Sequence, residues 1–373
     1  DFINFPIYLY KLVPSFFSNL IQYYIINPFS KNIGPLVLKG HTMPITNLQF
    51  NKDNDLLFSA SKDRYITLWS SEYGERIGTY YHSAAVYAMN VDDNSKYLIS
   101  SDSTGFVYIW EACNGEIVHK FTIDKIPLIS SVYFNYNNDL ISVGYGNRGA
   151  NSDSHVDIYK FNELLTKKKD VKPIKSILIP NKDKISKSRW FDLGKSIIAT
   201  SESGMIYKYD FESEKLLLQK KIHDSIIMDL DISPKEELIL TASKDGKAKV
   251  LDPDTFDVMS ELFPQNPVRN INACRFNPLI SSEDEKVVKY HAFIAGGQES
   301  RDVTTTTSKK GGFETLIYDC MYGEELGAVL GHFGPVNALA VSSDGEILAS
   351  GSEESSIRVH KINNDEYNNL ERK

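Results

Sequence analysis

The chain has 373 residues, 42% of them hydrophobic, and a formal net charge of −8 at pH 7. This length allows either two average domains or one large repeat fold. The acidic balance, with a pI near 5.6, argues against a protein whose main task is to bind the phosphates of nucleic acids. The three cysteines are isolated at Cys113, Cys274 and Cys320. They indicate neither a zinc site nor a disulfide framework, and a reducing compartment such as the cytoplasm fits them.

Residues 1–34 stand apart from the rest of the chain in composition. They hold nine aromatic residues and are interrupted by Pro6, Pro14 and Pro28. The longest uninterrupted piece, residues 15–27, is about half of the roughly 20 residues that a membrane-spanning helix needs. Four interpretations stay open for this segment: an appendage on the folded domain, a stretch foreign to the protein, a partner-binding helix, or a membrane contact.

The repeating unit of the chain is clearest in residues 40–69. It begins with Gly40 and His41, continues with apolar runs separated by the turn at residues 51–54, and ends at Trp69. Apolar and polar residues alternate within each run, which predicts β-strands rather than helices. Three short strands cannot bury a hydrophobic face alone, so the unit must repeat and stack on its copies.

The spacing of this unit recurs along the chain. A histidine lies 28 positions before the closing residue in four pairs: His41 and Trp69, His82 and Trp110, His223 and Leu251, His332 and His360. This pattern resembles the WD40 family of β-propellers. A terminal strand at residues 36–38 is expected to complete the last blade and to close the ring.

The resemblance implies a buried structural hydrogen-bond chain in each blade. In the first blade its members are His41, Ser59 or Ser61, Asp63 and Trp69, because a buried carboxylate and an indole N–H both need partners. The corresponding residues of later blades are His223 and Asp245 in the fifth and His332 in the last. Thr104 stands where the first blade has Asp63, so the chain of the second blade is expected to be weaker. A catalytic triad is disfavoured, because a nucleophile would not be needed in every blade.

The middle of the chain carries two segments that need an interpretation. Gly144, Gly146 and Gly149 have the GxGxxG spacing, but no helix pattern follows them, which favours a loop over a nucleotide site. The lysine run at residues 167–172 is expected to be a solvated connection. The last strand motif of the third blade is expected at residues 156–161, and the fourth blade at about residues 177–218.

A long insertion in the sixth blade is the most specific feature. Gly296 and Gly297 are followed by an insertion at residues 298–312, and the pair Phe313 and Glu314 follows it. Together with the sequence at residues 331–335 and the start of the first blade, this insertion resembles subunit i of eukaryotic translation initiation factor 3. We therefore predict an all-β, seven-bladed WD40 propeller over residues 35–362, with a non-propeller segment at 1–34 and a polar tail at 363–373. Seven blades of about 47 residues fill this span.

The resemblance implies a cytoplasmic, non-catalytic scaffold with no cofactor and no metal. Its expected partners are the C-terminal segment of the b subunit, the g subunit and, through the complex, the 40S ribosome with mRNA and initiator tRNA. No direct membrane contact is expected, and the acidic balance opposes direct binding of nucleic acid. The alternative is a WD40 adaptor in signalling or ribonucleoprotein assembly, resembling serine/threonine kinase receptor-associated protein, but the insertion at residues 298–307 discriminates against it.

Three aspartates are expected to end the third strands of blades 4, 5 and 6: Asp210, Asp252 and Asp319. The repeat geometry is expected to place them on one face near the rim. They could simply cap local turns, or they could form an acidic patch for basic residues of the b subunit, with Asp252 at its centre.

Overall fold

The structure, a computed structural model, describes residues 34–123, 128–146, 153–166, 171–264, 270–277, 290–298 and 312–362. Five expectations lie wholly or partly outside these residues. They concern the aromatic segment before residue 34, the loop that contains Gly149, the insertion after Gln298, the tail after residue 362 and the lysine run. The lysine run is described only at residues 171 and 172.

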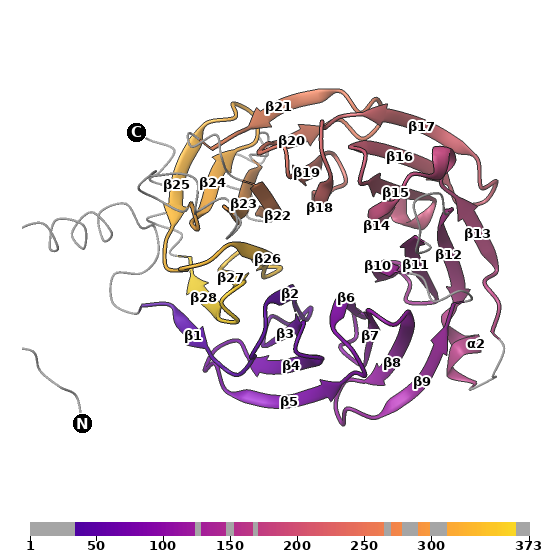
Figure 1. The fold of residues 1–373 in the computed structure, drawn as a ribbon, viewed down its shortest axis with the longest axis horizontal. Helices are drawn as coiled ribbons and strands as arrows, with labels where there is room; N and C mark the ends of the chain where they lie inside the picture. Colours follow the sequence, from indigo (N-terminus) through magenta and orange to yellow (C-terminus); the bar gives the residue numbers. More distant parts are fainter. Residues whose placement is uncertain are drawn as a thin grey trace, which may run out of the picture.

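Seven four-stranded antiparallel sheets are arranged as blades in a ring, as Figure 1 shows. Their inner strands line cavities at the centre of the ring, which we call the central channel. The predicted seven-bladed propeller is thus confirmed. In each blade the four strands follow one another from the channel to the rim. The strands of blades 1 to 3 are β2 (Ile45–Phe50), β3 (Leu56–Ser61), β4 (Tyr65–Ser70), β5 (Arg76–Tyr81), β6 (Val86–Val91), β7 (Tyr97–Asp102), β8 (Phe106–Glu111), β9 (Ile117–Thr122), β10 (Leu128–Phe134), β11 (Leu140–Gly146), β12 (Ser154–Lys160) and β13 (Lys175–Leu178).

Blades 4 to 7 repeat the same order. Their strands are β14 (Ile185–Phe191), β15 (Ser196–Ser201), β16 (Met205–Asp210), β17 (Leu216–Lys221), β18 (Ile227–Ile232), β19 (Ile239–Ser243), β20 (Ala248–Leu251), β21 (Val258–Leu262), β22 (Asn270–Asn277), β23 (His291–Gly297), β24 (Thr315–Asp319), β25 (Glu325–Val329), β26 (Val336–Val341), β27 (Ile347–Ser352) and β28 (Ile357–Lys361). Blade 7 is completed by β1 (Leu36–Leu38), which pairs antiparallel with β28. This pairing joins the two ends of the propeller and covers an edge that would otherwise be open.

The hydrophobic core lies between blades rather than at the centre of the ring. Phe58 and Leu68 of blade 1 pack in one buried cluster with Met89 and Trp110 of blade 2. Leu38 of β1 is buried in the cluster that joins blades 7 and 1. Stacking therefore buries the faces that a single blade would expose, which is why the repeated unit folds only as a set.

The third blade differs from the sequence prediction. Its third strand ends at Lys160, and Phe161–Leu165 forms the short helix α2, because Phe161 and Leu164 lie on one helical face and pack into the core between blades 2 and 3. The predicted start of blade 4 at residue 177 is also wrong. Ile177 belongs to β13, the outer strand of blade 3, and blade 4 begins with β14.

Candidate functional site

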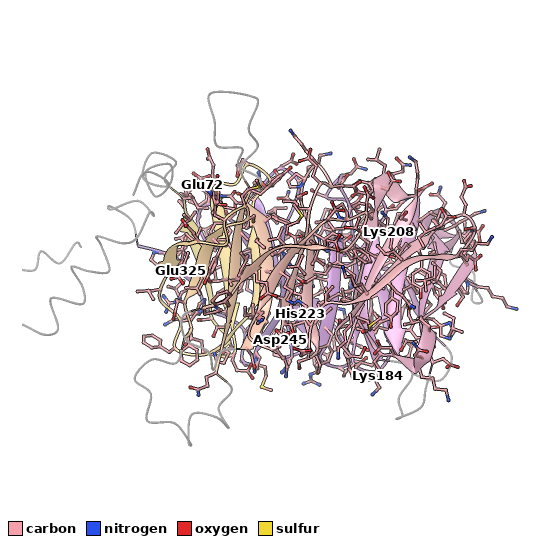
Figure 2. All side chains as sticks on the ribbon, turned by 90° about the horizontal axis from the view of Figure 1, so that it is seen from above. Glu72, Lys184, Lys208, His223, Asp245 and Glu325 are labelled. Atoms are coloured by element: carbon pink, nitrogen blue, oxygen red, sulfur yellow. The ribbon has the colours of Figure 1, made fainter. Side chains whose placement is uncertain are left out.

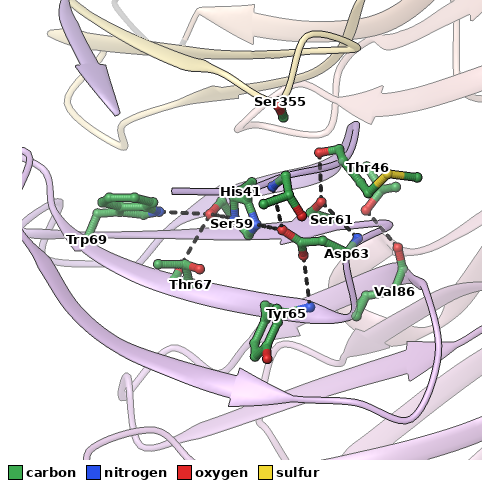
Figure 3. A network of polar contacts seen from close by, with 12 residues as sticks. His41, Thr46, Ser59, Ser61, Asp63, Tyr65, Thr67, Trp69, Val86 and Ser355 are labelled. Atoms are coloured by element: carbon green, nitrogen blue, oxygen red, sulfur yellow. Dashed lines mark hydrogen bonds and ion pairs between the residues drawn. The ribbon is translucent and has the colours of Figure 1, made fainter. Parts of the chain in front are cut away.

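The predicted hydrogen-bond chain of blade 1 can be traced atom by atom (Figure 3). His41 Nδ1 lies 2.9 Å from Asp63 Oδ2, and His41 Nε2 lies 2.8 Å from Ser59 Oγ. The Trp69 indole N–H donates to the same Ser59 Oγ at 2.8 Å. Ser61 is outside this chain, since its hydroxyl donates to the Met43 carbonyl and accepts from the Asp63 backbone N–H. These hydrogen bonds tie β3, β4 and the turn between them to the loop that enters the blade.

This arrangement does not expose a nucleophile. Ser59 is fully buried, and its hydroxyl lies between Trp69, His41 and the Thr67 carbonyl. Burial alone would raise the pKa of Asp63, but hydrogen bonds from His41 and from the Thr42 backbone hold it below its ordinary value. A carboxylate with this many donors stays ionised and holds the turn in place, which is a structural role.

Blades 5 and 7 contain the histidine, the hydroxyl and the carboxylate of this chain, but not the tryptophan. His223 lies 2.8 Å from Asp245 and 2.9 Å from Thr241 Oγ1. His332 lies 2.9 Å from Glu354, which occupies the position of the aspartate. In blade 5 burial would raise the pKa of Asp245, but the hydrogen bond and the charge of His223 and the backbone N–H groups of Lys247 and Asp224 lower it to about 2.

Other blades place a carboxylate in the same region from different positions in the sequence. In blade 2 the carboxylate is Asp102, which accepts from Ser83, Tyr108 and Thr104. Thr104 therefore supports a carboxylate rather than replacing one. The carboxylate of blade 3 is Asp157, bonded by Tyr145 and Ser176, and that of blade 4 is Asp183, bonded by Ser203 and Tyr207.

A network of charges that the sequence reasoning missed lines the central channel. Arg275 pairs with Asp229 at 2.5 Å, and Arg189 pairs with Asp231 at 3.0 Å. The four residues come from the inner strands β14, β18 and β22, so the two pairs tie three successive blades together. The signal was present in the sequence, because Asp229 and Asp231 are two positions apart and therefore share one face of a strand.

The three aspartates predicted near the rim lie at the ends of the third strands of blades 4, 5 and 6, and each accepts hydrogen bonds within its own turn. Asp252 Oδ1 accepts from the backbone N–H groups of Asp254 and Thr255 at 2.8 and 3.1 Å. Asp210 accepts from Ser213, and this hydrogen bonding lowers its pKa. Asp319 is buried and caps the turn at residues 320–324. Turn capping is therefore common to all three.

Asp210 and Asp252 are both half-buried, and neither makes an ion pair with a described residue, but the hydrogen bonds from Ser213 and the nearby Lys175 lower the pKa of Asp210. Two other acids in the turn of Asp252 do form pairs with blade 4, Asp254 with Lys208 at 3.1 Å and Asp257 with Lys220 at 2.6 Å.

Exposed apolar side chains accompany these acids on the rim of blades 5 and 6. They are Val258, Met259, Met321 and Tyr322, with 40%, 59%, 62% and 78% of their surface exposed. The turn that carries Met321 and Tyr322 leans on the outer strand of blade 5, where Ser260 donates to the Cys320 carbonyl. Acidic and apolar groups therefore share one continuous part of the surface.

Acidic residues are abundant at this end of the other blades as well. All turns between first and second strands, and between third and fourth strands, lie at one end of the blades, which we call the acidic face; Glu72 marks it near the upper edge of Figure 2. The eleven such turns between consecutive strands that are described in full contain 19 Asp and Glu residues and five Lys residues, a net charge of −14. The opposite end carries the hydrogen-bond chains of four residues, such as His41, Ser59, Asp63 and Trp69, and we call it the tetrad face. Lys184 marks it near the lower edge of Figure 2. Its ten fully described turns hold seven acidic and seven basic residues.

Two further properties of the described residues bear on function. Their helices are too short or too polar to cross a membrane. No cluster of three or more His, Cys, Asp or Glu side chains among them has an arrangement that could hold a metal ion.

Comparison with known proteins agrees with the resemblance found in the sequence. A family model described as EIF3I matches residues 33–372. The chain is 33% identical over 334 residues to eukaryotic translation initiation factor 3 subunit I of Kluyveromyces lactis, covering 87% of this chain and 91% of that protein. The proteins of the same name from Schizosaccharomyces pombe and Homo sapiens are 31% and 30% identical, each covering 87% of this chain and 95% of its own length.

Proposed function

Because the chain belongs to the family of eukaryotic translation initiation factor 3 subunit I, and so is a propeller subunit of that factor, we propose that it acts there as a non-catalytic scaffold. Its task is to hold other subunits, b and g among them, while the factor recruits the 40S ribosome, mRNA and initiator tRNA in the cytoplasm. The family match over nearly the whole propeller carries this proposal. The same match decides against the alternative of a signalling adaptor.

We further propose that the b subunit docks on the acidic face at blades 5 and 6. A basic, amphipathic tail suits this surface, where Met259 on β21 and the turn with Met321 and Tyr322 expose apolar area and Asp252 offers a carboxylate. The apolar side chains supply buried area on binding, and the carboxylates orient the basic partner. An arginine of the tail could bond the Asp252 carboxylate through two N–H groups. The same acidic face disfavours direct contact with RNA phosphates.

The broad proposal is tested by affinity purification of the tagged full chain from native cytosol, followed by mass spectrometry. We expect the other subunits of initiation factor 3 in the purified complex. Their absence, with a different set of partners in their place, would contradict the scaffold proposal itself.

The docking proposal is tested by titrating the C-terminal segment of the b subunit into the full chain in a calorimeter. Asp252→Lys should weaken binding more than tenfold, which is about 1.4 kcal/mol. Asp252→Asn retains an acceptor oxygen for the turn and removes the charge, so it should also weaken binding while melting like the wild type. Asp53→Lys makes the same change in charge on blade 1 of the same face and should bind normally. Normal binding by Asp252→Lys would move the docking site elsewhere and leave the scaffold proposal intact.

A further inference from the structure

The tetrad face has a cavity of its own at the end of the central channel. It has a volume of about 650 Å³ and is lined by inner strands and by the turns between second and third strands. Four of its lining residues come from four consecutive blades: Lys62 from blade 1, Tyr87 from blade 2, Leu128 from blade 3 and Lys187 from blade 4. Two apolar side chains therefore lie between two cations on one side of this mouth.

The cations of this group are available to a ligand. The ammonium groups of Lys62 and Lys187 make no ion pair with any described residue, and both side chains are half-buried. At the floor of the cavity the carboxylate of Asp229 is already neutralised by Arg275 at 2.5 Å. Burial would raise the pKa of Asp229, but Arg275 and, more weakly, Lys187 lower it, and Arg275 is the cation that pairs with this carboxylate.

The remaining acids of the lining do not cancel these cations. Glu353, on blade 7, accepts a hydrogen bond from the Asn337 amide at 2.8 Å. Glu202 follows β15 in blade 4 and is exposed to solvent, where its charge is screened. Lys244 of blade 5 adds a third lysine to the lining. The half of the mouth formed by blades 1 to 4 therefore carries two lysines, Lys62 and Lys187, against the single acid Glu202, and its net charge is positive.

The apolar part of the mouth is open as well. Tyr87 is 36% exposed and Leu128 is 45% exposed, although both lie on inner strands, whose side chains are mostly buried. A side chain that covered them would bury apolar surface, at about 25 cal/mol per Å². The order of the four residues around the ring thus places an apolar contact between two charge contacts.

We propose that this mouth binds an extended acidic peptide segment in which an aromatic or aliphatic residue stands between carboxylates. The apolar residue packs on Tyr87 and Leu128, and the flanking carboxylates pair with Lys62 and Lys187. The opposite face, with its net charge of −14 in the described turns, repels such a segment, so the two ends of the channel select partners of opposite charge. This site is separate from the surface around Asp252 and does not depend on the b subunit.

The test is selection of phage-displayed random peptides on the immobilised full chain. Peptides recovered on the wild type should contain Asp or Glu on both sides of an apolar residue. A synthetic copy of the most enriched peptide, labelled with fluorescein, should bind the wild type in a polarisation assay. Its affinity should fall as salt rises from about 0.05 to about 0.5 M.

Charge reversal then assigns the peptide to the mouth. The double variant Lys62→Glu, Lys187→Glu should bind more than tenfold more weakly. The matched control Lys215→Glu, Lys235→Glu makes the same change on the acidic face and should bind like the wild type. If the reversal variant does not melt like the wild type, the neutral pair Lys62→Gln, Lys187→Gln replaces it. Tyr87→Ser tests the apolar contact without changing charge and should also weaken binding.

Three results would overturn the proposal. One is a failure of the wild type to enrich any peptide family, and another is enrichment of peptides without acidic residues. The third is equal binding of the acidic peptide by the wild type and by the variants of Lys62 and Lys187.

Discussion

Replacing Asp245 by asparagine measures how much one buried carboxylate contributes to the propeller. Asp245 accepts hydrogen bonds from His223 and from the backbone N–H groups of Asp224 and Lys247. Its side chain is 13% exposed, and its pKa is lowered from an ordinary 3.8 to about 2. Since one pKa unit corresponds to 1.36 kcal/mol, the ionised form contributes about 2 kcal/mol to folding. We expect Asp245→Asn to lower the free energy of unfolding by about this amount at pH 7.

The dependence on pH follows from the direction of the shift. The pKa is lower in the folded state, so the contribution is fully present above pH 3.8 and is lost as the pH falls toward 2. The difference in stability between the wild type and Asp245→Asn, measured by urea denaturation, should therefore narrow between about pH 5 and about pH 2.5. A difference that stays constant over this range would refute the ionised role of Asp245.

A neighbouring residue gives the control for this experiment. Asp224 lies in the same region and is exposed, and it contributes only its backbone N–H to the Asp245 carboxylate. Asp224→Ala keeps that N–H, so it should change the free energy of unfolding by less than about 0.5 kcal/mol. A loss equal to that of Asp245→Asn would show that general surface charge, rather than the buried hydrogen-bond chain, sets the stability.

Two further changes test the assembly of the ring. In blade 2, Asp102→Ala should destabilise the protein by about 1–3 kcal/mol, because it leaves buried donors without an acceptor. Thr104→Ala should destabilise the protein less. Equal shifts in the thermal midpoint of the two variants would contradict this ranking. Removal of residues 1–34 should leave a cooperatively melting propeller. Removal of residues 1–39 should not, because it also deletes β1 and opens the edge of β28. A soluble, cooperatively melting fragment that begins at Gly40 would show that closure does not depend on β1.

The fold was predictable because the signal is repeated. A histidine and a closing residue at a fixed separation recur in four blades, and alternation of apolar residues marks the strands between them. The hydrogen-bond chain of blades 1 and 5 was readable for the same reason, since His41 and His223 each have an aspartate 22 positions later.

The hydrogen-bonded carboxylates of blades 2, 3 and 4 could not be predicted from the spacing of residues in the sequence. Asp102, Asp157 and Asp183 lie at three different positions relative to the strands, one at the end of a second strand, one in a third strand and one in the loop before a first strand. Blades 1 to 5 and 7 each hold a hydrogen-bonded carboxylate, and these examples show that several backbone positions can supply it. A one-dimensional pattern detects only the copies that kept the same position.

Surface properties were predictable only in part. The three aspartates were expected on one face, but Asp319 is buried in its turn, and sequence alone does not reveal which acid a neighbouring lysine neutralises. The pairing of Asp254 with Lys208 joins two blades and depends on how they pack. Exposure and ion pairing depend on tertiary structure. The sequence could therefore propose Asp252 as a binding residue, but it could not show which of the nearby acids are exposed and unpaired.

The two ends of the blades carry different constraints, and this difference explains how one repeated fold can present two unlike surfaces. On the tetrad face, Asp63, Asp183, Asp245 and Glu354 are committed to hydrogen bonds that hold one strand or loop to another. The turns of the acidic face cap themselves, as Asp252 does with its own backbone, so they need no such chain. They are free to vary in charge and apolar content while the blade beneath them stays fixed. A scaffold that must bind several partners gains from this division, because changes to one binding surface leave the interactions that hold the ring together in place.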